Sequence, residues 1–506
     1  MKEKTRTQKA KLNMAFSLLQ QGIAFVCGLI VPRLMINAFG SEAYGATSSI
    51  ATFLSYITLL EGGIGAVTRS ALYKAFASKS SDQISAVVTE TQSFYRKITY
   101  AFIVYVIIIA CIFKQISHNT VFDFWYSFSL VIVIAISTCA EYLIGISYTL
   151  LLQSDQMNYI AVAFRIITTI MNTIGIVFLI NLKCDILRVK LFSSVVFMIR
   201  PIFLSYYVKK RYKLNKVHCL EKLLKNKKSA LGQHIAWAIH NNTDIAVLTI
   251  FKDLTYVSVY SVYYMVISQL QNIMNSFSSG MEAVFGSMYA NNEKENLQNT
   301  FGYYETLISI LSISLFSAAA VLIVPFVRIY TSGISDANYI NPIFSFMMII
   351  AALLSTLRTP YGHMIIAAGQ YKETRMAAYG EAIINISISI IFVISFGLVG
   401  VAIGTALAML FRFVYYAIYL SKHILHRHIK LWIKRMISNM LSFGVSYGIG
   451  HCVVEKLSID NYLSWAFAGV FVSVIAIVFT LLINMFLYKT DIIAIYQKGF
   501  AKFARH

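Results

Sequence analysis

Residues 461–488 read NYLSWAFAGVFVSVIAIVFTLLINMFLY, a run that contains no Asp, Glu, Lys or Arg. The hydrocarbon core of a bilayer is about 30 Å thick, and an α-helix crosses it with ~20 mainly apolar residues. The run therefore predicts a membrane-spanning helix. The rest of the chain repeats this pattern.

The composition indicates that the whole chain is a membrane protein. Of its 506 residues, 58% are apolar and 13% are charged. Soluble domains usually contain about 25% charged residues. A soluble enzyme, a disordered chain and a disulfide scaffold are therefore excluded. We predict an all-α polytopic membrane protein with fourteen transmembrane helices, near residues 13–36, 43–67, 98–116, 125–152, 158–182, 187–208, 231–251, 256–289, 301–327, 339–367, 374–395, 398–421, 437–453 and 461–488.

The basic residues predict the orientation. The net charge is +21, which on a soluble protein would suggest nucleic acid. With the N-terminus placed inside, 31 of the 43 Lys and Arg residues fall in inside segments and seven in outside loops. This bias follows the positive-inside rule. We therefore predict that both termini are cytoplasmic and that nucleic acid is not a partner.

The predicted loops are short, and none exceeds ~30 residues. They leave no room for a soluble catalytic or ATP-binding domain, and no G-x-x-x-x-G-K-[ST] motif occurs. We expect no enzymatic activity, no cofactor and no metal site.

A weak internal repeat suggests two similar halves. Phe39-x4-Tyr44 and Phe251-x4-Tyr256 precede the second and eighth spans, and Ala66-Val67-x-x-Ser70 and Ala283-Val284-x-x-Ser287 lie near their far ends. The predicted parts are an N-terminal lobe with helices 1–6 (1–208), a basic cytoplasmic linker (209–230), a C-terminal lobe with helices 7–12 (231–421), and helices 13 and 14 with a cytoplasmic tail (422–506).

When Lys114, Arg188 and Lys190 are counted with the outside loops and Arg375 with an inside segment, the five basic residues left in the predicted spans are all arginines: Arg33, Arg165, Arg200, Arg358 and Arg412. Ionisable residues at this depth are costly and usually face a cavity or a partner. The last four lie at a similar depth, roughly 10–14 Å from the inner interface at 1.5 Å per residue. A guanidinium binds phosphate through two parallel hydrogen bonds. The set predicts an anion site, although snorkelling or ion pairing between helices would also place arginines here.

Acidic residues in the predicted spans accompany these arginines in both halves: Glu61, Glu141, Asp244, Glu282 and Glu381. Together the charges predict a hydrated central cavity. Acids in a low-dielectric cavity can titrate near neutral pH, so these residues are candidates for H⁺ or Na⁺ coupling. Ion pairing with the arginines is the alternative.

Two further patterns lie toward the C-terminus. The run His423, His426 and His428 looks like a metal-binding tract, but it lies in a basic inside loop, where a solvated surface on anionic lipid is expected. Gly400-x3-Gly404 and Gly444-x3-Gly448 have the small-xxx-small spacing that lets helices approach closely.

Several positions follow one another in a recognisable order. In the first half they are Asn13, Pro32-Arg33, the segments 39–45 and 61–65, and Arg69; in the second half they are Asp244, Tyr256, Tyr260, Arg358-Thr359-Pro360, Gly369, Glu381, Asn385, Gly400, Gly404-Thr405 and Arg412. This order resembles that of polysaccharide-unit flippases, the O-antigen, capsule and exopolysaccharide exporters of the MOP (multidrug/oligosaccharidyl-lipid/polysaccharide) superfamily. The resemblance covers most of residues 12–421.

The resemblance implies two pseudo-symmetric six-helix lobes around a central cavity, with two C-terminal helices added. It also implies a substrate, an oligosaccharide repeat unit on undecaprenyl diphosphate. Alternating access would move this substrate from the inner to the outer leaflet of the bacterial cytoplasmic membrane, for lipopolysaccharide or capsule biosynthesis. It further implies that Arg165, Arg200, Arg358 and Arg412, and also Arg33, line the cavity and bind the substrate. Membrane lipids, a polysaccharide polymerase and glycosyltransferases are the implied partners.

Three alternatives remain. A peptidoglycan-precursor flippase and an ion-coupled multidrug exporter would share the superfamily. A drug site for cations should be rich in acids and aromatic residues and should lack a set of arginines. A membrane enzyme acting on the same lipid-linked sugar would need catalytic residues on sizeable outer loops, which this sequence lacks.

Overall fold

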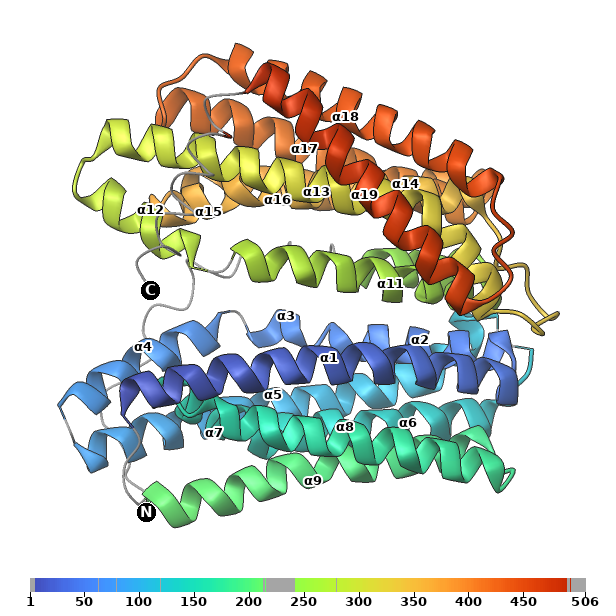
Figure 1. Cartoon of the computed structure of the whole chain (residues 1–506). Helices are drawn as coiled ribbons and strands as arrows, with labels where there is room; N and C mark the ends of the chain where they lie inside the picture. Colours follow the sequence, from blue (N-terminus) through green and yellow to red (C-terminus); the bar gives the residue numbers. More distant parts are fainter. Residues whose placement is uncertain are drawn as a thin grey trace. The chain divides into compact units, whose positions relative to one another are not determined.

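The computed structural model of the chain describes residues 5–61, 63–78, 80–118, 120–212, 214, 242–278, 280–488 and 492. All regular secondary structure in these residues is helical (Figure 1). The backbone divides into two compact units, residues 1–258 and 259–506, here called the first and second units. Their boundary falls within α11 (Leu254–Ser278). The lobe and linker boundaries at 208, 230 and 421 stay predictions.

The first unit is a bundle of long helices, several of them interrupted. In chain order these are α1 (Arg6–Phe39), α2 (Ser41–Ser55), α3 (Thr58–Glu61), α4 (Ile64–Ala77), α5 (Ser81–Ile116), α6 (Phe124–Ala140), the π-helix η1 (Glu141–Gly145), α7 (Ile146–Ser154), α8 (Asn158–Asn181), α9 (Ile186–Tyr212) and the helix Asn242–Phe251. Helix α8 packs along α1 and α9, and α6 packs against α5 and α9.

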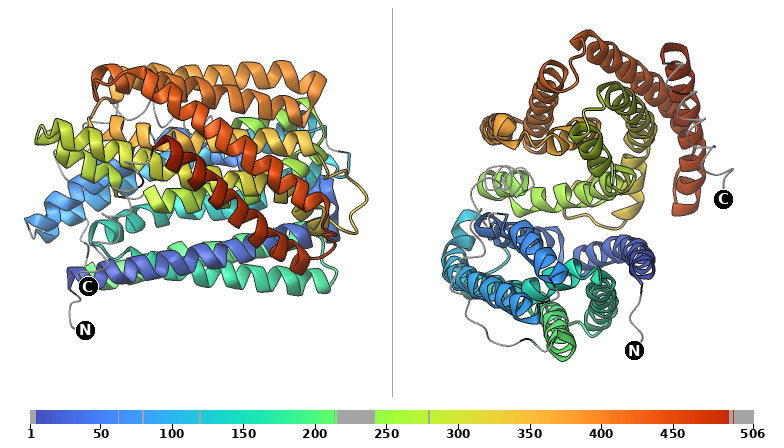
Figure 2. Two further views of the ribbon diagram at one scale, coloured as in Figure 1. Left: turned by 45° about the horizontal axis from the view of Figure 1, so that its top comes forward. Right: turned by 90° about the vertical axis from the view of Figure 1, so that its left-hand side faces the viewer.

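The second unit is built in the same manner. It contains most of α11, followed by α12 (Met281–Ala290), α13 (Lys294–Tyr330), α14 (Pro342–Leu357), α15 (Thr359–Ala367), α16 (Tyr371–Phe396), α17 (Leu398–His423), α18 (Ile429–Glu455) and α19 (Tyr462–Leu487). Helix α17 packs along α16 and α14, whereas α13 packs against α18 and α19. The right-hand view of Figure 2 looks nearly along the helix axes of each bundle.

Ten described helices are long and apolar enough to cross a membrane, or eleven if the bent pair 41–61 and 64–77 is one span. The chain is therefore an all-α, multi-pass membrane protein. Helices α11 and α18 also reach spanning length, with 25 and 27 residues, but lie outside these ten. The total of fourteen spans stays a prediction, since most of the expected span 231–251 lies outside the described residues.

Interruptions in the long helices place charged residues. Helix α3 ends at Glu61, and the chain bends by 50° before α4. Glu141 opens the π-helix η1 between α6 and α7. Arg358 separates α14 from α15, whose first turn contains Pro360. Breaks at membrane depth occur where protein or water satisfies the freed backbone groups. Three of the ionisable residues singled out by the sequence thus lie at helix breaks.

The break after α3 has a counterpart in the second unit. Gly280 precedes α12 with φ 90°, as Gly63 precedes α4 with φ 78°. Glycine adopts this left-handed conformation without the steric penalty of a Cβ. Each glycine stands three residues before the recurring Ala-Val pair, at Ala66 or Ala283. The weak sequence repeat therefore coincides with a left-handed glycine before a short helix in both units.

Small residues bring α16 and α17 into close contact. A Cβ on Gly400 would lie 2.2 Å from the backbone oxygen of Phe392, and one on Gly404 would also overlap its neighbours on α16. In the described structure no atom lies within 4 Å of a Cβ built on Gly444 or Gly448. The close approach predicted for both glycine pairs is confirmed for the first and wrong for the second.

A buried carboxylate joins three parts of the second unit. Glu305 on α13 is 3% exposed and accepts hydrogen bonds of 2.9 and 3.1 Å from both terminal nitrogens of Arg427. Arg435 on α18 pairs with the same carboxylate at 3.3 Å, and the hydroxyl of Tyr361 on α15 donates to it. Burial lowers the pKa of Arg427, but the Glu305 carboxylate more than reverses this effect and the pKa is raised. The network thus joins α13, α15 and α18 through charge.

The glycine contact predicts a difference between two matched substitutions. Gly400→Ala should lower the free energy of unfolding by roughly 1–3 kcal/mol, because the added methyl group must displace the Phe392 backbone. Gly444→Ala should be neutral or stabilising by up to about 1 kcal/mol, because the site is open and alanine favours the helix. Thermal unfolding of the two purified proteins in detergent measures both effects. Equal midpoints would contradict the contact.

The buried network predicts a large effect from a change of one charge. Glu305→Gln leaves Arg427 and Arg435 buried without their carboxylate and should cost about 3–5 kcal/mol of stability. Glu295→Gln is the matched control, because Glu295 lies exposed on the first turn of the same helix. The yield of monodisperse protein and its unfolding midpoint provide the measurement. A Glu305→Gln variant as stable as the control would show that the network is dispensable.

Candidate functional site

The first unit contains a cluster of two arginines and one glutamate, here called the first cluster: Arg165, Arg200 and Glu141. Arg200 on α9 donates a 3.2 Å hydrogen bond to Glu141, and both side chains are largely buried. Arg165 on α8 interacts electrostatically with both. Three sequence-predicted residues, from distant parts of the chain, therefore meet in one place.

The π-helix sets the position of Glu141. A π-turn adds one residue to a helical turn, and such turns are frequent at functional sites. Gly145, the last residue of η1, faces the acid: a Cβ there would lie 2.6 Å from Glu141 Oε2. Any larger residue at this position would push the carboxylate away. The local sequence therefore leaves room for the acid beside Arg200.

The same π-helix also contacts the acid at the break in the second span. The hydroxyl of Tyr142, the residue after Glu141, donates a hydrogen bond to Glu61 at the end of α3. Glu61 is half-buried, and the Tyr142 side chain packs near Tyr95 of α5. Two consecutive residues of η1 thus contact charged groups of other helices: Glu141 pairs with Arg200, and Tyr142 donates to Glu61.

The second unit contains an equivalent set, here called the second cluster: Arg358, Arg412 and Glu381. Arg412 on α17 pairs with Glu381 on α16, which is 1% exposed. It also donates a 2.9 Å hydrogen bond to the Tyr416 hydroxyl. The guanidinium carbons of Arg412 and Arg358 lie 5.1 and 5.7 Å from the centroid of the same Tyr416 ring. One tyrosine therefore orients both arginines of this cluster.

Each cluster contains one paired arginine and one unpaired arginine. Arg200 and Arg412 hold the glutamates. The side chains of Arg165 and Arg358 make no ion pair or hydrogen bond with any residue that the structure describes. Each cluster thus carries one surplus positive charge. Such a charge in an apolar helix bundle favours an anion beside it.

Further donor capacity lies unused at the clusters. The Nε atoms of three arginines are buried and have no hydrogen-bond partner among the described residues: Arg200, Arg358 and Arg412. A buried donor without a partner is costly, and a bound ligand can relieve this cost. The arrangement is suited to accept an anion with several oxygen atoms.

Three other sequence-predicted residues are not members of the clusters. Arg33 lies half-buried on α1. Asp244 is 4% exposed in the helix Asn242–Phe251 and interacts electrostatically with Tyr56. Glu282 lies exposed on the first turn of α12, directly after the break at Gly280. The roles in binding or ion coupling expected for these residues stay predictions.

Sequence reasoning missed the third set of charges, around Glu305. The sequence places Arg427 and Arg435 in the inside segment 422–436, where they count only toward the positive-inside bias. Their side chains are nevertheless only 14% and 10% exposed. The available signal was Glu305 itself, the sole charged residue in the expected span 301–327. Tyr361 of this network stands three residues after Arg358, so the network fixes the short helix that follows the second cluster.

Metal chemistry has little to support it in the described residues. No group of three or more His, Cys, Asp or Glu side chains lies close enough there to hold a metal ion. The expectations of no metal, no cofactor and no enzymatic activity stay predictions, because the structure carries no ligand.

Comparison with solved structures shows which known proteins share this fold. No protein-family model and no curated protein matches the sequence. Among solved structures, the lipid II flippase MurJ in an inward closed conformation is 17% identical, covering 95% of this chain and 100% of that one, with a TM-score of 0.69. An inward-facing multidrug resistance MATE family transporter of the MOP superfamily is 12% identical, covering 79% and 95%, with a TM-score of 0.65.

A third structure is described as a MOP superfamily transporter from Pyrococcus furiosus whose binding pocket of reverse polarity suggests a different function. It is 12% identical, covering 81% of this chain and 93% of that one, with a TM-score of 0.54. These identities are too low to carry a substrate from one protein to another. The chain has the fold of the MOP superfamily transporters and flippases.

Proposed function

We propose that this protein is a flippase for undecaprenyl-diphosphate-linked oligosaccharide repeat units in the bacterial cytoplasmic membrane. It would move these units from the inner to the outer leaflet by alternating access, for the biosynthesis of O-antigen, capsule or another surface polysaccharide. Both termini would be cytoplasmic. Glycosyltransferases would supply the lipid-linked sugar, and a polysaccharide polymerase would consume it.

The observation that carries this proposal is the unpaired arginine in each cluster. A protein that needed only to fasten its helices would use one arginine for each glutamate. Arg165 and Arg358 are not needed for such pairing. Arg165 adds a like charge beside Arg200, and Arg358 adds one beside Arg412. Repulsion between like charges disfavours the empty site and favours one occupied by phosphate oxygens. A diphosphate provides oxygens for more than one guanidinium.

A multidrug exporter is the less favoured alternative. The fold by itself permits it, because one similar structure is described as a multidrug resistance transporter. A cationic drug would have to approach a cluster with a surplus positive charge, and this would cost several kcal/mol at low dielectric. The charge of the two clusters supports an anionic substrate instead.

A peptidoglycan-precursor flippase is supported equally well by the fold. One similar structure is described as a lipid II flippase, and its match extends over 95% of this chain. Arginines that bind a lipid-linked diphosphate would serve either substrate. The preference for the polysaccharide substrate rests on the motifs from Asn13 to Arg412, so the choice between the two has to be made by experiment.

The substrate is tested by flipping in proteoliposomes that contain the purified full-length chain. Three substrates are compared: an undecaprenyl-diphosphate oligosaccharide, lipid II and a cationic dye. We expect the oligosaccharide lipid to become accessible at the opposite leaflet fastest. Faster movement of lipid II would assign the peptidoglycan role, and movement of the dye alone would refute an anion site.

The paired and unpaired arginines predict opposite effects on stability. Arg358→Gln removes a like charge beside Arg412, so flipping should fall while the unfolding midpoint is unchanged or raised. Arg412→Gln leaves Glu381 buried without its partner, so flipping and stability should both fall, the latter by about 3–5 kcal/mol. Arg165→Gln and Arg200→Gln form the corresponding pair in the first unit.

Two controls complete this test. Arg358→Lys and Arg165→Lys keep the charge but lose the planar fork, so they should flip substrate less well than the native protein at equal protein levels. Arg96→Gln changes an exposed arginine of α5 and should be nearly silent. Normal flipping by both glutamine variants at Arg165 and Arg358 would exclude the proposed anion site.

Ion coupling, where present, should depend on acids that lie outside the two arginine clusters. Glu61 accepts a hydrogen bond from the Tyr142 phenol, and Asp244 is 4% exposed. We predict that Glu61→Gln or Asp244→Asn removes any dependence of flipping on an imposed pH or Na⁺ gradient, whereas Glu381→Gln mainly lowers the amount of folded protein. Flipping that ignores both gradients in the native protein would exclude the coupling role.

A further inference from the structure

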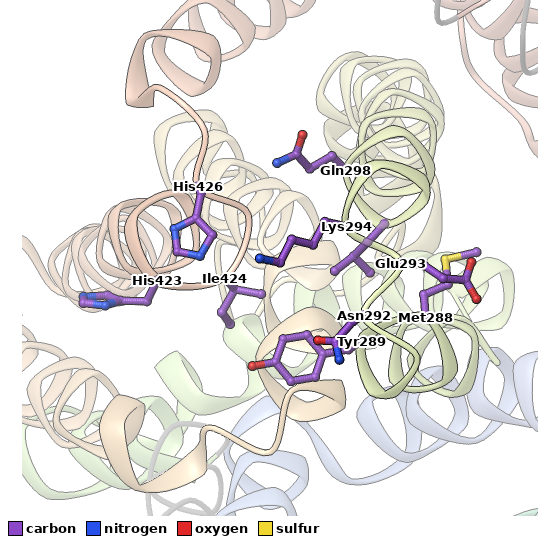
Figure 3. Close-up of a pocket in the computed structure, with 10 residues that line it drawn as sticks. Met288, Tyr289, Asn292, Glu293, Lys294, Gln298, His423, Ile424 and His426 are labelled. Carbon is purple, nitrogen blue, oxygen red and sulfur yellow. The ribbon is translucent and has the colours of Figure 1, made fainter.

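A polar pocket lies in the second unit and shares no residue with the arginine clusters (Figure 3). Its volume is about 190 Å³, well above the ~15 Å³ that a single water needs. Its walls come from the end of α12, the first turns of α13 and the segment that follows α17. The pocket therefore joins two loops that are more than a hundred residues apart in the sequence.

The loops that form the pocket are held in place by local structure. Asn292, between α12 and α13, and His426, between α17 and α18, both have positive φ, 54° and 47°. These tight turns bring the loop ends together. Gln298 Nε2 on α13 donates a 2.6 Å hydrogen bond to the backbone oxygen of Leu425. The two sides of the pocket are thus linked directly.

Cationic and neutral donors gather on the inner side of the pocket. Lys294 extends from α13 toward His426, and Tyr289 lies below them (Figure 3). The one acid of the lining, Glu293, points away from this group, and its Oε2 accepts a 3.1 Å hydrogen bond from Asn296. The adjoining segment 422–436 contains no Asp or Glu. The side of the pocket that Glu293 faces away from therefore carries the positive charge of Lys294.

Apolar side chains complete the wall. Met288, Leu297 and Ile424 line the pocket beside the donors, and Leu297 and Ile424 are buried. Both contributing loops are expected on the cytoplasmic side, directly next to membrane spans. A free inorganic ion would gain nothing from the apolar wall, whereas a phospholipid joins its phosphate to apolar acyl chains.

We propose that this pocket binds the phosphate of an anionic phospholipid headgroup from the cytoplasmic leaflet. Lys294 supplies the permanent charge, His426 and the Tyr289 hydroxyl supply further hydrogen bonds, and Ile424 contacts the first methylene groups of an acyl chain. Basic pockets between helices at the cytoplasmic surface suit phosphate headgroups on electrostatic grounds. The lipid would tie the turn before α13 to the end of α17.

The histidines do not favour a metal ion here. Of the tract His423, His426 and His428, only the first two line the pocket. Lys294 extends toward His426 and would repel a divalent cation there, whereas the His423 ring points away from both (Figure 3). An imidazole beside an ammonium group is better matched to an anion.

The test uses the purified full-length chain in an uncharged detergent. Its thermal unfolding midpoint is measured against added short-chain phosphatidylglycerol, with short-chain phosphatidylcholine and glycerol 3-phosphate as separate arms. We expect a saturable rise with phosphatidylglycerol and a much smaller one with phosphatidylcholine. Glycerol 3-phosphate should have little effect, because it lacks the apolar part.

Matched variants assign the effect to the pocket. Lys294→Gln combined with His426→Asn, a residue that tolerates positive φ, should weaken the apparent affinity for phosphatidylglycerol on the order of tenfold or more. Lys294→Arg should retain binding. Lys97→Gln and His428→Asn change exposed residues outside the pocket and should leave the affinity unchanged.

Three results would overturn the proposal. They are equal responses to the two lipids, an unchanged affinity in the double variant, and an equal loss in the two control variants. Saturable binding of glycerol 3-phosphate with the same dependence on Lys294 would refute the lipid and assign the pocket to a soluble phosphate ester.

Discussion

The cost of buried charge governs how each unit is organised. A carboxylate or guanidinium inside an apolar helix bundle is stable only when paired or hydrogen-bonded. The described structure meets this requirement for three buried glutamates, each within its own unit: Glu141 pairs with Arg200, Glu381 with Arg412, and Glu305 with Arg427 and Arg435. Because the pairs are internal, a unit can move as a body without breaking them.

Helix breaks allow these charges to reach one another. A regular helix presents its side chains on fixed faces, so a charge aimed at a distant helix needs a local change of backbone. The π-helix aims Glu141 at Arg200, and the interruption at Arg358 brings that side chain over the Tyr416 ring. Each break removes backbone hydrogen bonds from its helix and so lowers the stability of that span. Their coincidence with the charged residues indicates that the spans are built around these sites.

Hydropathy and charge predicted much of this architecture from the sequence. Each expected span coincides with helix in the described residues, and the four mid-membrane arginines fall into two clusters, two in each unit. The partner of each arginine could not be predicted, since Glu141 and Arg200 are far apart in the chain and many pairings satisfy the same composition. The π-helix was also invisible, because its sequence EYLIG continues the apolar pattern on both sides.

Other features could not be predicted from the sequence, and the physical reasons can be named. Arg427 and Arg435 look like ordinary cytoplasmic charges, because a loop residue that folds back onto a buried acid has the same local sequence as one that faces solvent. Gly444 and Gly448 have the spacing of a packing motif, yet spacing does not show which helix face meets a neighbour. Sequence periodicity describes one helix at a time, whereas these properties belong to pairs of helices.

The substrate has to be inferred from charge, since the fold does not determine it. The same fold occurs in structures described as a multidrug transporter, a lipid II flippase and a transporter with a pocket of reverse polarity. A common fold can therefore host different functions. In this chain the acids of both clusters are already neutralised by Arg200 and Arg412. The charge left over is that of Arg165 and Arg358, and the proposal of an anionic substrate rests on this surplus.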